Sequence, residues 1–238
     1  MDGVPPADVD GDALAGPMLQ LLVWMSPAFP TGAFAYSQGL EWMAERRVVT
    51  DRATLADWLL DLARHGALRN DLVLLAAAWR ATAARDAEAF RQVAELALAL
   101  QPSAERRLEA VTQGNAFAKA IADAWPTASV GWLADAWTGD LALPVAVGAS
   151  TAGHGVPLAS ALSAFAVSTV TNLVSAAIRL SVVGQTDGQR VIAGLLSPLR
   201  DAATAAAAST LDDLGAATFA ADLASIRHET QYTRLFRS

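Results

Sequence analysis

The chain has 238 residues, of which 53% are hydrophobic and 17% charged, so part of an unusually apolar surface is expected to meet a partner. Its formal net charge is -7 at pH 7, which argues against nucleic-acid binding because phosphate backbones are recognised by basic surfaces. The absence of cysteine excludes disulfides and thiolate metal sites and permits a cytoplasmic location.

The first segment of the chain, residues 1–16, is expected to form a flexible acidic arm because it holds four Asp and two Pro. It lacks the basic and apolar regions of a secretory signal, so none is expected. Ordered structure should begin near Met18, and residues 17–238 should form one domain. The prolines of residues 26–32 predict a rigid elbow. A helix should follow, carrying Phe34 through Met43, with another backbone packed close to Gly39.

Apolar residues at helical spacing predict a succession of helices after this elbow. Thr50 or Asp51 should cap a helix whose stripe is Leu55, Trp58, Leu59 and Leu62. Further helices are expected over residues 70–84, 86–100, 103–125, 128–137 and 143–151. In the segment 103–125 the spacing favours a stripe of Leu108, Val111, Asn115, Ala118, Ala122 and Trp125.

The last part of the chain continues this pattern. Turn-forming residues at 184–188 precede an alanine-rich helix that should run to about Ser209, and the final helix should show Phe219, Leu223 and Ile226. No alternating strand pattern is evident in the sequence. We therefore predict an all-α, single-domain helical bundle packed around one long apolar helix.

That long apolar helix is predicted over residues 157–182, and the stretch from Gly155 to Ile178 contains no charged residue. The length would suit a bilayer, but serine, threonine and asparagine occur on every face and no second span follows, so a core helix is favoured over a membrane span. One stripe holds Leu162, Phe165, Thr169, Asn172, Ala176 and Arg179. Asn172 could fix helix register while Arg179 leaves the core, or Arg179 could be offered to a partner's phosphate or carboxylate.

The sequence shows no arrangement typical of a catalytic centre. The single lysine, Lys119, lies outside any phosphate-binding loop, and residues 148–153 miss the spacing of a serine hydrolase. His65, His154 and His228 are far apart in sequence and form no metal-binding motif. His154, between two glycines, is either a transient metal contact or a helix C-cap. We therefore expect no enzyme activity, catalytic residue, resident metal or cofactor.

The end of the chain is rich in residues that anchor interfaces. Tyr232, Leu235 and Phe236 alternate with Arg234 and Arg237 where most chains become polar. Two interpretations stand side by side. The segment either docks on the body of the same chain or offers a site to a partner.

Four groups of residues resemble the UreF family of urease accessory proteins. The resemblance covers the chain from Met18 onward. Its motifs are Ser26-Pro27-x-x-Pro30-x-Gly32-x-Phe34-x-Tyr36-Ser37-Gln38-Gly39-Leu40-Glu41, then Leu143-Pro144-Val145 with Gly148, then Asn172 with Gly184-Gln185-Thr186-Asp187-Gly188-Gln189-Arg190, and finally His228-Glu229-Thr230-Gln231-Tyr232-Thr233-Arg234-Leu235-Phe236-Arg237-Ser238.

The resemblance implies an all-helical, homodimeric, non-enzymatic chaperone of metallocentre assembly in the cytoplasm. Such a protein would bridge UreD (also called UreH) and the GTPase UreG for GTP-dependent nickel insertion into apo-urease, with no nucleic-acid or membrane partner. An alternative role is a GTPase-activating regulator of UreG that supplies an arginine, Arg179.

The resemblance also implies which residues meet the partners. Glu41 and Arg179 would face UreG together with Gln38 and Tyr36, although many family members have lysine where this chain has Arg179. The end of the chain would fold back and shape the surface that recruits UreG. Its residues in that role are His228, Glu229, Tyr232, Arg234, Leu235, Phe236 and Arg237.

Overall fold

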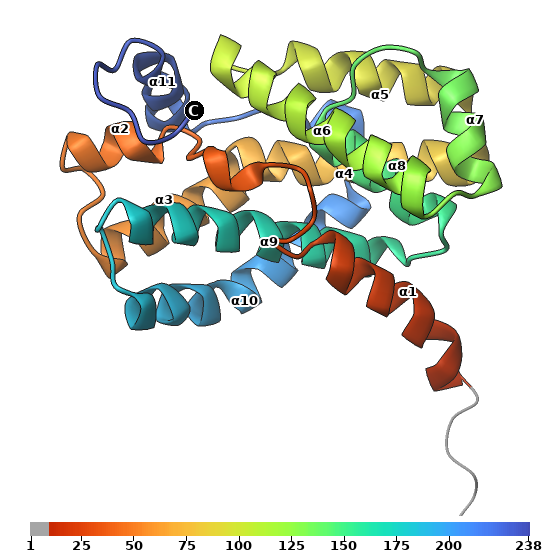
Figure 1. Cartoon of the computed structure of the whole chain (residues 1–238), viewed down its shortest axis with the longest axis horizontal. Coiled ribbons are helices and arrows are strands. Elements are labelled where there is room, and N and C mark those ends of the chain that lie inside the picture. The colour runs from red at the N-terminus through yellow and green to blue at the C-terminus, as the bar shows by residue number, and fades with distance from the viewer. Residues whose placement is uncertain (1–9) are drawn as a thin grey trace, which may run out of the picture.

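The computed structural model describes residues 10–238, and residues 1–9 of the predicted arm lie outside it. Within the described residues all regular structure is helical, which confirms the all-α prediction (Figure 1). The elements are α1 (Asp10–Trp24), η1 (Ala33–Ala35), α2 (Leu40–Glu45), α3 (Arg52–His65), α4 (Ala67–Ala84), α5 (Ala87–Ala99), α6 (Ala104–Ala124), α7 (Ala128–Ala136), α8 (Leu143–Gly153), α9 (Leu158–Arg179), α10 (Gln185–Ala208), η2 (Leu211–Asp213) and α11 (Phe219–His228).

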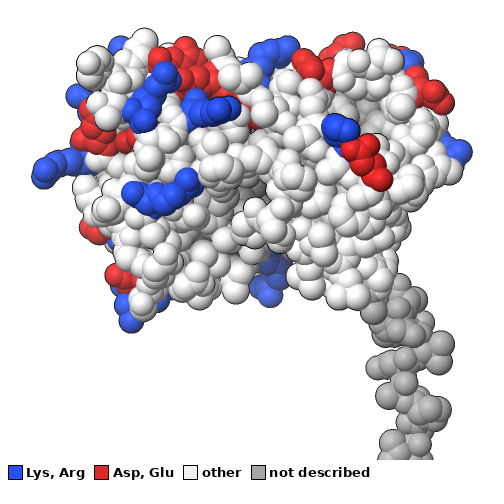
Figure 2. Space-filling view, in the orientation of Figure 1, with Lys and Arg blue, Asp and Glu red and all other residues white. Residues whose placement is uncertain are grey.

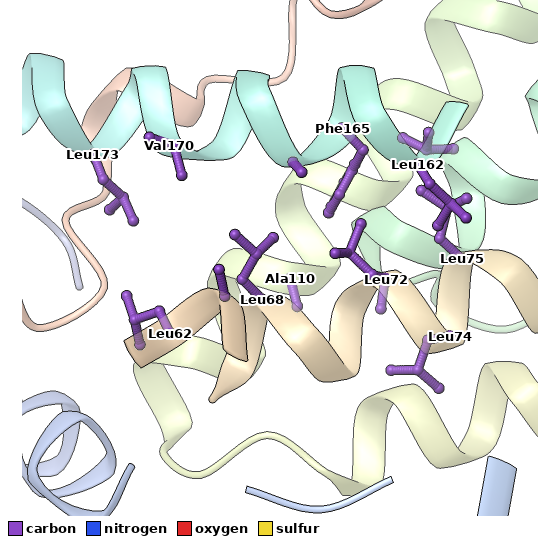
Figure 3. Close-up of a cluster of buried hydrophobic side chains, with 14 of the residues drawn as sticks. Leu62, Leu68, Leu72, Leu74, Leu75, Ala110, Leu162, Phe165, Val170 and Leu173 are labelled. Carbon is purple, nitrogen blue, oxygen red and sulfur yellow. The ribbon is translucent and has the colours of Figure 1, made fainter. Parts of the chain in front are cut away.

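Helix α9 is the apolar helix predicted to organise the core. It lies antiparallel to α4 (Figure 3). Its side chains Leu162, Phe165 and Leu173 point toward α4, where Leu68 and Leu72 lie, and all five side chains are buried. Within the described residues α9 alone is long and apolar enough to cross a bilayer, but half of that segment is buried inside the protein. It is therefore the core helix of a bundle, as the scattered polar residues indicated.

The junction between α9 and α10 differs from the prediction. Residues 185–188 were expected in a turn, but they form the first turn of α10, which begins at Gln185. The glycine there serves packing instead. A Cβ on Gly188 would lie 2.9 Å from Cδ1 of Ile178 and 3.0 Å from Cγ1 of Val174, so glycine permits α10 to lie close against α9.

The region around α2 also differs from the prediction of one continuous helix. The chain makes the short 3-10 helix η1, and α2 begins only at Leu40. Gln38 and Gly39 between them have positive φ angles of 57° and 81°, which an α-helix does not allow. A Cβ on Gly39 would lie 2.9 Å from the backbone nitrogen of Ser225 in α11, so the expected close approach of another backbone is confirmed.

Helix α1 begins at Asp10, earlier than the start expected near Met18, and runs through Pro17. It projects beyond the rest of the bundle (Figure 1). Leu21 and Trp24 on its inner side are buried, whereas the outer side exposes large apolar side chains. These are Met18, Leu19, Leu22 and Val23.

Helix α6 buries a different face from the predicted stripe. Leu108 is 58% exposed, and the buried side carries polar groups, Arg106, Glu109 and Gln113, beside Phe117. The sequence pattern failed because charged residues are normally placed outward, whereas here they find partners in the interior. Helix α11 shows a similar inversion, since Phe219, Leu223 and Ile226 are exposed and small residues pack inward.

Candidate functional site formed by the docked tail

Residues 229–238, called the tail below, fold back from α11 onto the body of the protein. The backbone amide of Arg237 donates to the carbonyl of Ala35 at 2.8 Å, and that of Ser37 donates to the carbonyl of Ser238 at 2.7 Å. The Phe236 ring is buried. The first of the two interpretations of this segment is therefore what the structure shows: it docks within the same chain.

Glu41 of α2 anchors the docked tail on its buried side. It is only 7% exposed, although the family resemblance implied that it faces a partner. Its carboxylate accepts hydrogen bonds from the backbone amides of Leu235 at 2.6 Å and Phe236 at 3.0 Å. Hydrogen bonds to an ionised acceptor are among the stronger ones in proteins. The tail is irregular and has no helix or sheet to provide acceptors for these two amides, so the Glu41 carboxylate provides them.

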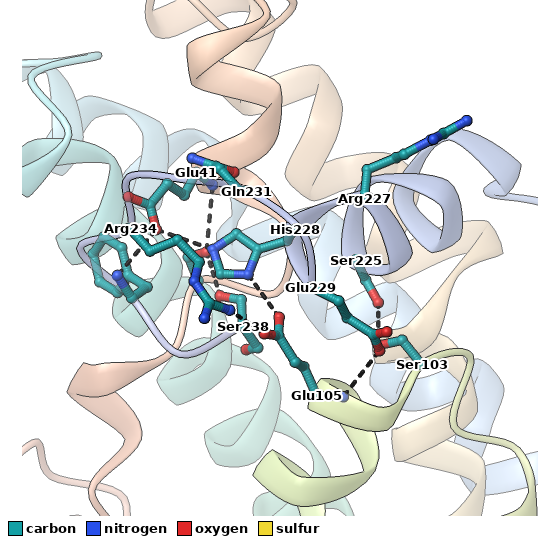
Figure 4. A network of polar contacts seen from close by, with 12 residues as sticks. Glu41, Ser103, Glu105, Ser225, Arg227, His228, Glu229, Gln231, Arg234 and Ser238 are labelled. Carbon is teal, nitrogen blue, oxygen red and sulfur yellow. Dashed lines mark hydrogen bonds and ion pairs between the residues drawn. The ribbon is translucent and has the colours of Figure 1, made fainter.

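His228, the last residue of α11, joins this anchor to α6 (Figure 4). The imidazole has no exposed surface, and its Nε2 lies 3.0 Å from Glu41 Oε2 while its Nδ1 lies 2.7 Å from Glu105 Oε2. The other oxygen of Glu105 accepts from Arg234 of the tail at 2.5 Å. Two carboxylates, one imidazole and one guanidinium therefore form a continuous network between α2, α6 and the tail.

Two further contacts fix the start of the tail on α6. Glu229 Oε1 accepts from the free backbone amides of Ala104 at 2.7 Å and Glu105 at 3.3 Å, at the first turn of the helix. A carboxylate is favoured there by the positive end of the helix dipole. Ser225 of α11 lies 2.5 Å from the capping residue Ser103, measured between their hydroxyl oxygens.

The remaining predicted site residues divide between the surface and the interior. Tyr232, Leu235 and Arg237 of the tail are exposed, and so is Arg179 at the end of α9. The Arg179 guanidinium lies 4.4 Å from the centre of the Phe236 ring, a cation–π contact, and partial burial lowers its pKa from the ordinary value. Tyr36 is buried, and Gln38 donates to Glu109 at 3.0 Å.

A cavity of about 790 Å³ opens beside this network, between α1, α6 and α9. Figure 2 shows a hollow near the middle of a face whose central band carries few charged side chains. The rim is largely apolar, but its polar wall includes Asp71, Arg106, Glu109 and Gln113. Asn172 of α9 also lines it and donates to the carbonyl of Ala33 at 3.0 Å, so its side chain ties α9 to η1.

Glu109 connects the wall of the cavity to the tail. Its carboxylate accepts from the Arg106 guanidinium at 2.5 Å and from Gln113 at 3.0 Å on the cavity side. It also accepts from the hydroxyl of Ser238 at 2.6 Å on the tail side. Sequence reasoning missed Glu105, Arg106 and Glu109, because their partners lie more than a hundred residues away or on the face taken to be exposed.

Asp71 on the cavity wall is the carboxyl most affected by this environment. Burial raises its pKa from 3.8 to about 7, an effect that Arg106 opposes and Glu109 reinforces. Burial alone would lower the pKa of Arg106, but the Glu109 and Asp71 carboxylates raise it above its ordinary value. The guanidinium therefore stays charged, while Asp71 exchanges its proton near neutrality.

This shift predicts that Asp71 destabilises the folded protein increasingly as pH rises from about 4 to 7. Over that range the folded state binds the proton that the unfolded state has released. Asp71→Asn should therefore raise the free energy of unfolding at pH 8 by on the order of 1–3 kcal/mol, with little effect at pH 4. Urea unfolding at both pH values measures this, and an equal effect at both would contradict it.

His154 caps the C-terminus of α8, as one of its two interpretations held. Its Nδ1 lies 2.7 Å from the carbonyl oxygen of Ser150 and its Nε2 lies 2.9 Å from that of Trp125, so both ring nitrogens are occupied by backbone. In the part of the chain that the structure describes, no three His, Cys, Asp or Glu side chains are arranged to hold a metal ion.

Comparison with known proteins places these features in a family. A family model described as UreF matches residues 49–196. The chain is 54% identical to the urease accessory protein UreF of Rhodopseudomonas palustris (strain BisB5), over 93% of this chain and 91% of the relative. It is also 50% identical to UreF of Bradyrhizobium diazoefficiens, over 94% and 93%, and 48% identical to UreF of Methylobacterium radiotolerans, over 99% and 100% of the two chains.

Proposed function

Because this chain belongs to the UreF family of urease accessory proteins, non-catalytic factors of urease maturation, we propose that it acts as a cytoplasmic scaffold. In this role it bridges UreD (also called UreH) and the GTPase UreG during GTP-dependent nickel insertion into apo-urease. The observation that carries the proposal is the docked tail. Buried charged groups hold its inner side, and its outer side exposes side chains of the types that form interfaces.

The proposed surface for UreG consists of Arg179, Tyr232, Leu235 and Arg237, called the tail surface below. All four are exposed, and aromatic and arginine side chains are the most frequent anchors of protein interfaces. Glu41 and Phe236 lie beneath this surface and fix its backbone. The family-derived residues thus divide into those that meet the partner and those, including Glu41 and Tyr36, that support the segment from the interior.

Assembly of the purified protein with UreD and UreG tests this proposal. Gel filtration should show one complex that contains all three proteins. Arg179→Ala should weaken UreG binding about tenfold, because it removes a cationic anchor. Arg91→Ala, an exposed arginine of α5, is the control and should leave binding unchanged. Failure of the wild-type protein to bind UreD and UreG would overturn the scaffold function.

The same preparation separates the scaffold from a GTPase-activating regulator. An arginine finger accelerates GTP hydrolysis by orders of magnitude, so a regulator of that kind would raise UreG turnover and lose the effect in Arg179→Ala. The contact between Arg179 and Phe236 favours docking, because it holds the guanidinium on the tail surface instead of leaving it free to reach a nucleotide. If the protein is only a scaffold, the rate of GTP hydrolysis by UreG should be the same with the wild-type protein and with Arg179→Ala.

The outer side of α1 supports the further proposal that the protein forms a homodimer. An isolated helix of this length is marginal in water, and α1 projects from the bundle with Met18, Leu19, Leu22 and Val23 exposed. Leu22→Arg should therefore convert a dimer to a monomer by light scattering. Leu108→Arg, at an equally exposed leucine of α6, should not. A wild-type monomer at all concentrations, or a Leu22→Arg dimer, would contradict this.

A further inference from the structure

His228 stands between two carboxylates that come from different parts of the fold. Glu41 approaches Nε2 from α2, and Glu105 approaches Nδ1 from α6. The ring has no exposed surface, so water does not supply a partner to either nitrogen. Arg234 of the tail and Glu229 complete the charged groups around it, and Glu229 is bonded to the backbone amides that start α6.

The hydrogen-bonding capacity of imidazole decides which form of the ring fits this position. A neutral ring has one N–H and one lone pair, so one carboxylate would face a lone pair at 3.0 or 2.7 Å. The imidazolium ion donates from both nitrogens and satisfies both carboxylates. With Arg234 it also balances the two negative charges of Glu41 and Glu105 inside the protein.

We propose that His228 is the positioning residue of the tail and that it holds the tail as an imidazolium ion bridging Glu41 and Glu105. The bridge orients the carboxylate of Glu41, and that carboxylate in turn accepts the amides of Leu235 and Phe236. Replacement of the ring by a side chain that cannot bridge both carboxylates should therefore weaken tail docking.

This inference deepens the proposed function, because the tail carries the proposed surface for UreG. Its tests do not use complex formation. Should the protein fail to bind UreG while His228 proves to be an imidazolium ion, the scaffold proposal falls and the positioning role stands. If the protein binds UreG but His228 is not an imidazolium ion, the positioning role falls and the scaffold proposal stands.

The protonation of His228 can be read directly from imidazole nitrogen chemical shifts by NMR of the wild-type protein. The His65→Gln and His154→Gln variants assign the three rings. We expect the His228 ring to give the imidazolium signature at pH 6 and a proton on both nitrogens. The proposal would be overturned if the ring were a neutral tautomer at pH 6 while the tail amides were protected from exchange. This test needs no substitution of His228.

The link to the tail is measured by hydrogen exchange at the amides of Leu235 and Phe236, corrected for the intrinsic exchange rate. In His228→Gln the protection of these amides should be about tenfold to a hundredfold lower than in the wild type, because one charge-assisted hydrogen bond is lost. The control His154→Gln should follow the wild type. Equal protection in His228→Gln and the wild type would overturn the link.

Discussion

Replacing Glu41 by alanine should release the tail from the body of the protein and abolish urease activation while the helices stay folded. The substitution removes the acceptor of the Leu235 and Phe236 amides and leaves His228 facing an empty side of its buried site. Removing one partner of a buried charge pair typically costs about 3–5 kcal/mol. Because the amides that Glu41 accepts belong to the tail, this cost should appear in tail docking and not in the core formed by α4, α8 and α9.

Three measurements on matched variants test this expectation. Hydrogen exchange of residues 229–238 should increase sharply, circular dichroism should remain close to wild type, and urease co-expressed with the variant should stay inactive. Glu45→Ala is the control, since Glu45 is exposed on the same helix. Glu41→Gln should lie between the two, because one amide oxygen still accepts a hydrogen bond. A tail that stays protected in Glu41→Ala would show that its other contacts, such as those of Arg234 and Ser238, are enough to hold it.

The contacts of the tail explain why it could be recognised from sequence but not placed. Its aromatic and arginine residues indicated an anchor, and the resemblance to a known family indicated that it folds back. Which side chains point inward was not predictable, because the segment is irregular and has no period. The structure buries Phe236 and leaves its neighbour Leu235 exposed, and Glu41, which accepts the backbone amides of both, lies nearly two hundred residues earlier.

Helix α6 shows the same limit for regular structure. Its existence followed from the sequence, and α9 was placed correctly as the core helix. The buried face of α6 did not follow, because it carries Arg106 and Glu109, and burial of charge depends on partners that only the tertiary fold supplies. In α6, the positions where local pattern reasoning failed are therefore those that build the cavity wall and hold the tail, as expected for functional sites.

Gly148→Ala should lower the stability of the whole protein more than most conservative substitutions. Gly148 lies in α8 where that helix crosses α4, and a Cβ there would sit 2.4 Å from the carbonyl oxygen of Leu75 and 3.1 Å from Cβ of Ala78. The backbone oxygen cannot move without displacing α4, so the two helices must separate. Overpacking of this kind costs about 1–3 kcal/mol, and more where backbone is involved.

The control substitution is expected to have the opposite sign. Gly194 lies in α10 with no atom within 4 Å of the position of a Cβ, so Gly194→Ala should raise the free energy of unfolding by about 0.5–1 kcal/mol through helix propensity. The same gain is available to Gly148→Ala, and the close contact with α4 at Leu75 and Ala78 opposes it. Urea denaturation of both variants therefore isolates the cost of that contact. Equal midpoints would mean that α8 and α4 can separate freely, in which case this crossing would not fix the position of α8 beneath α6 and its buried charges.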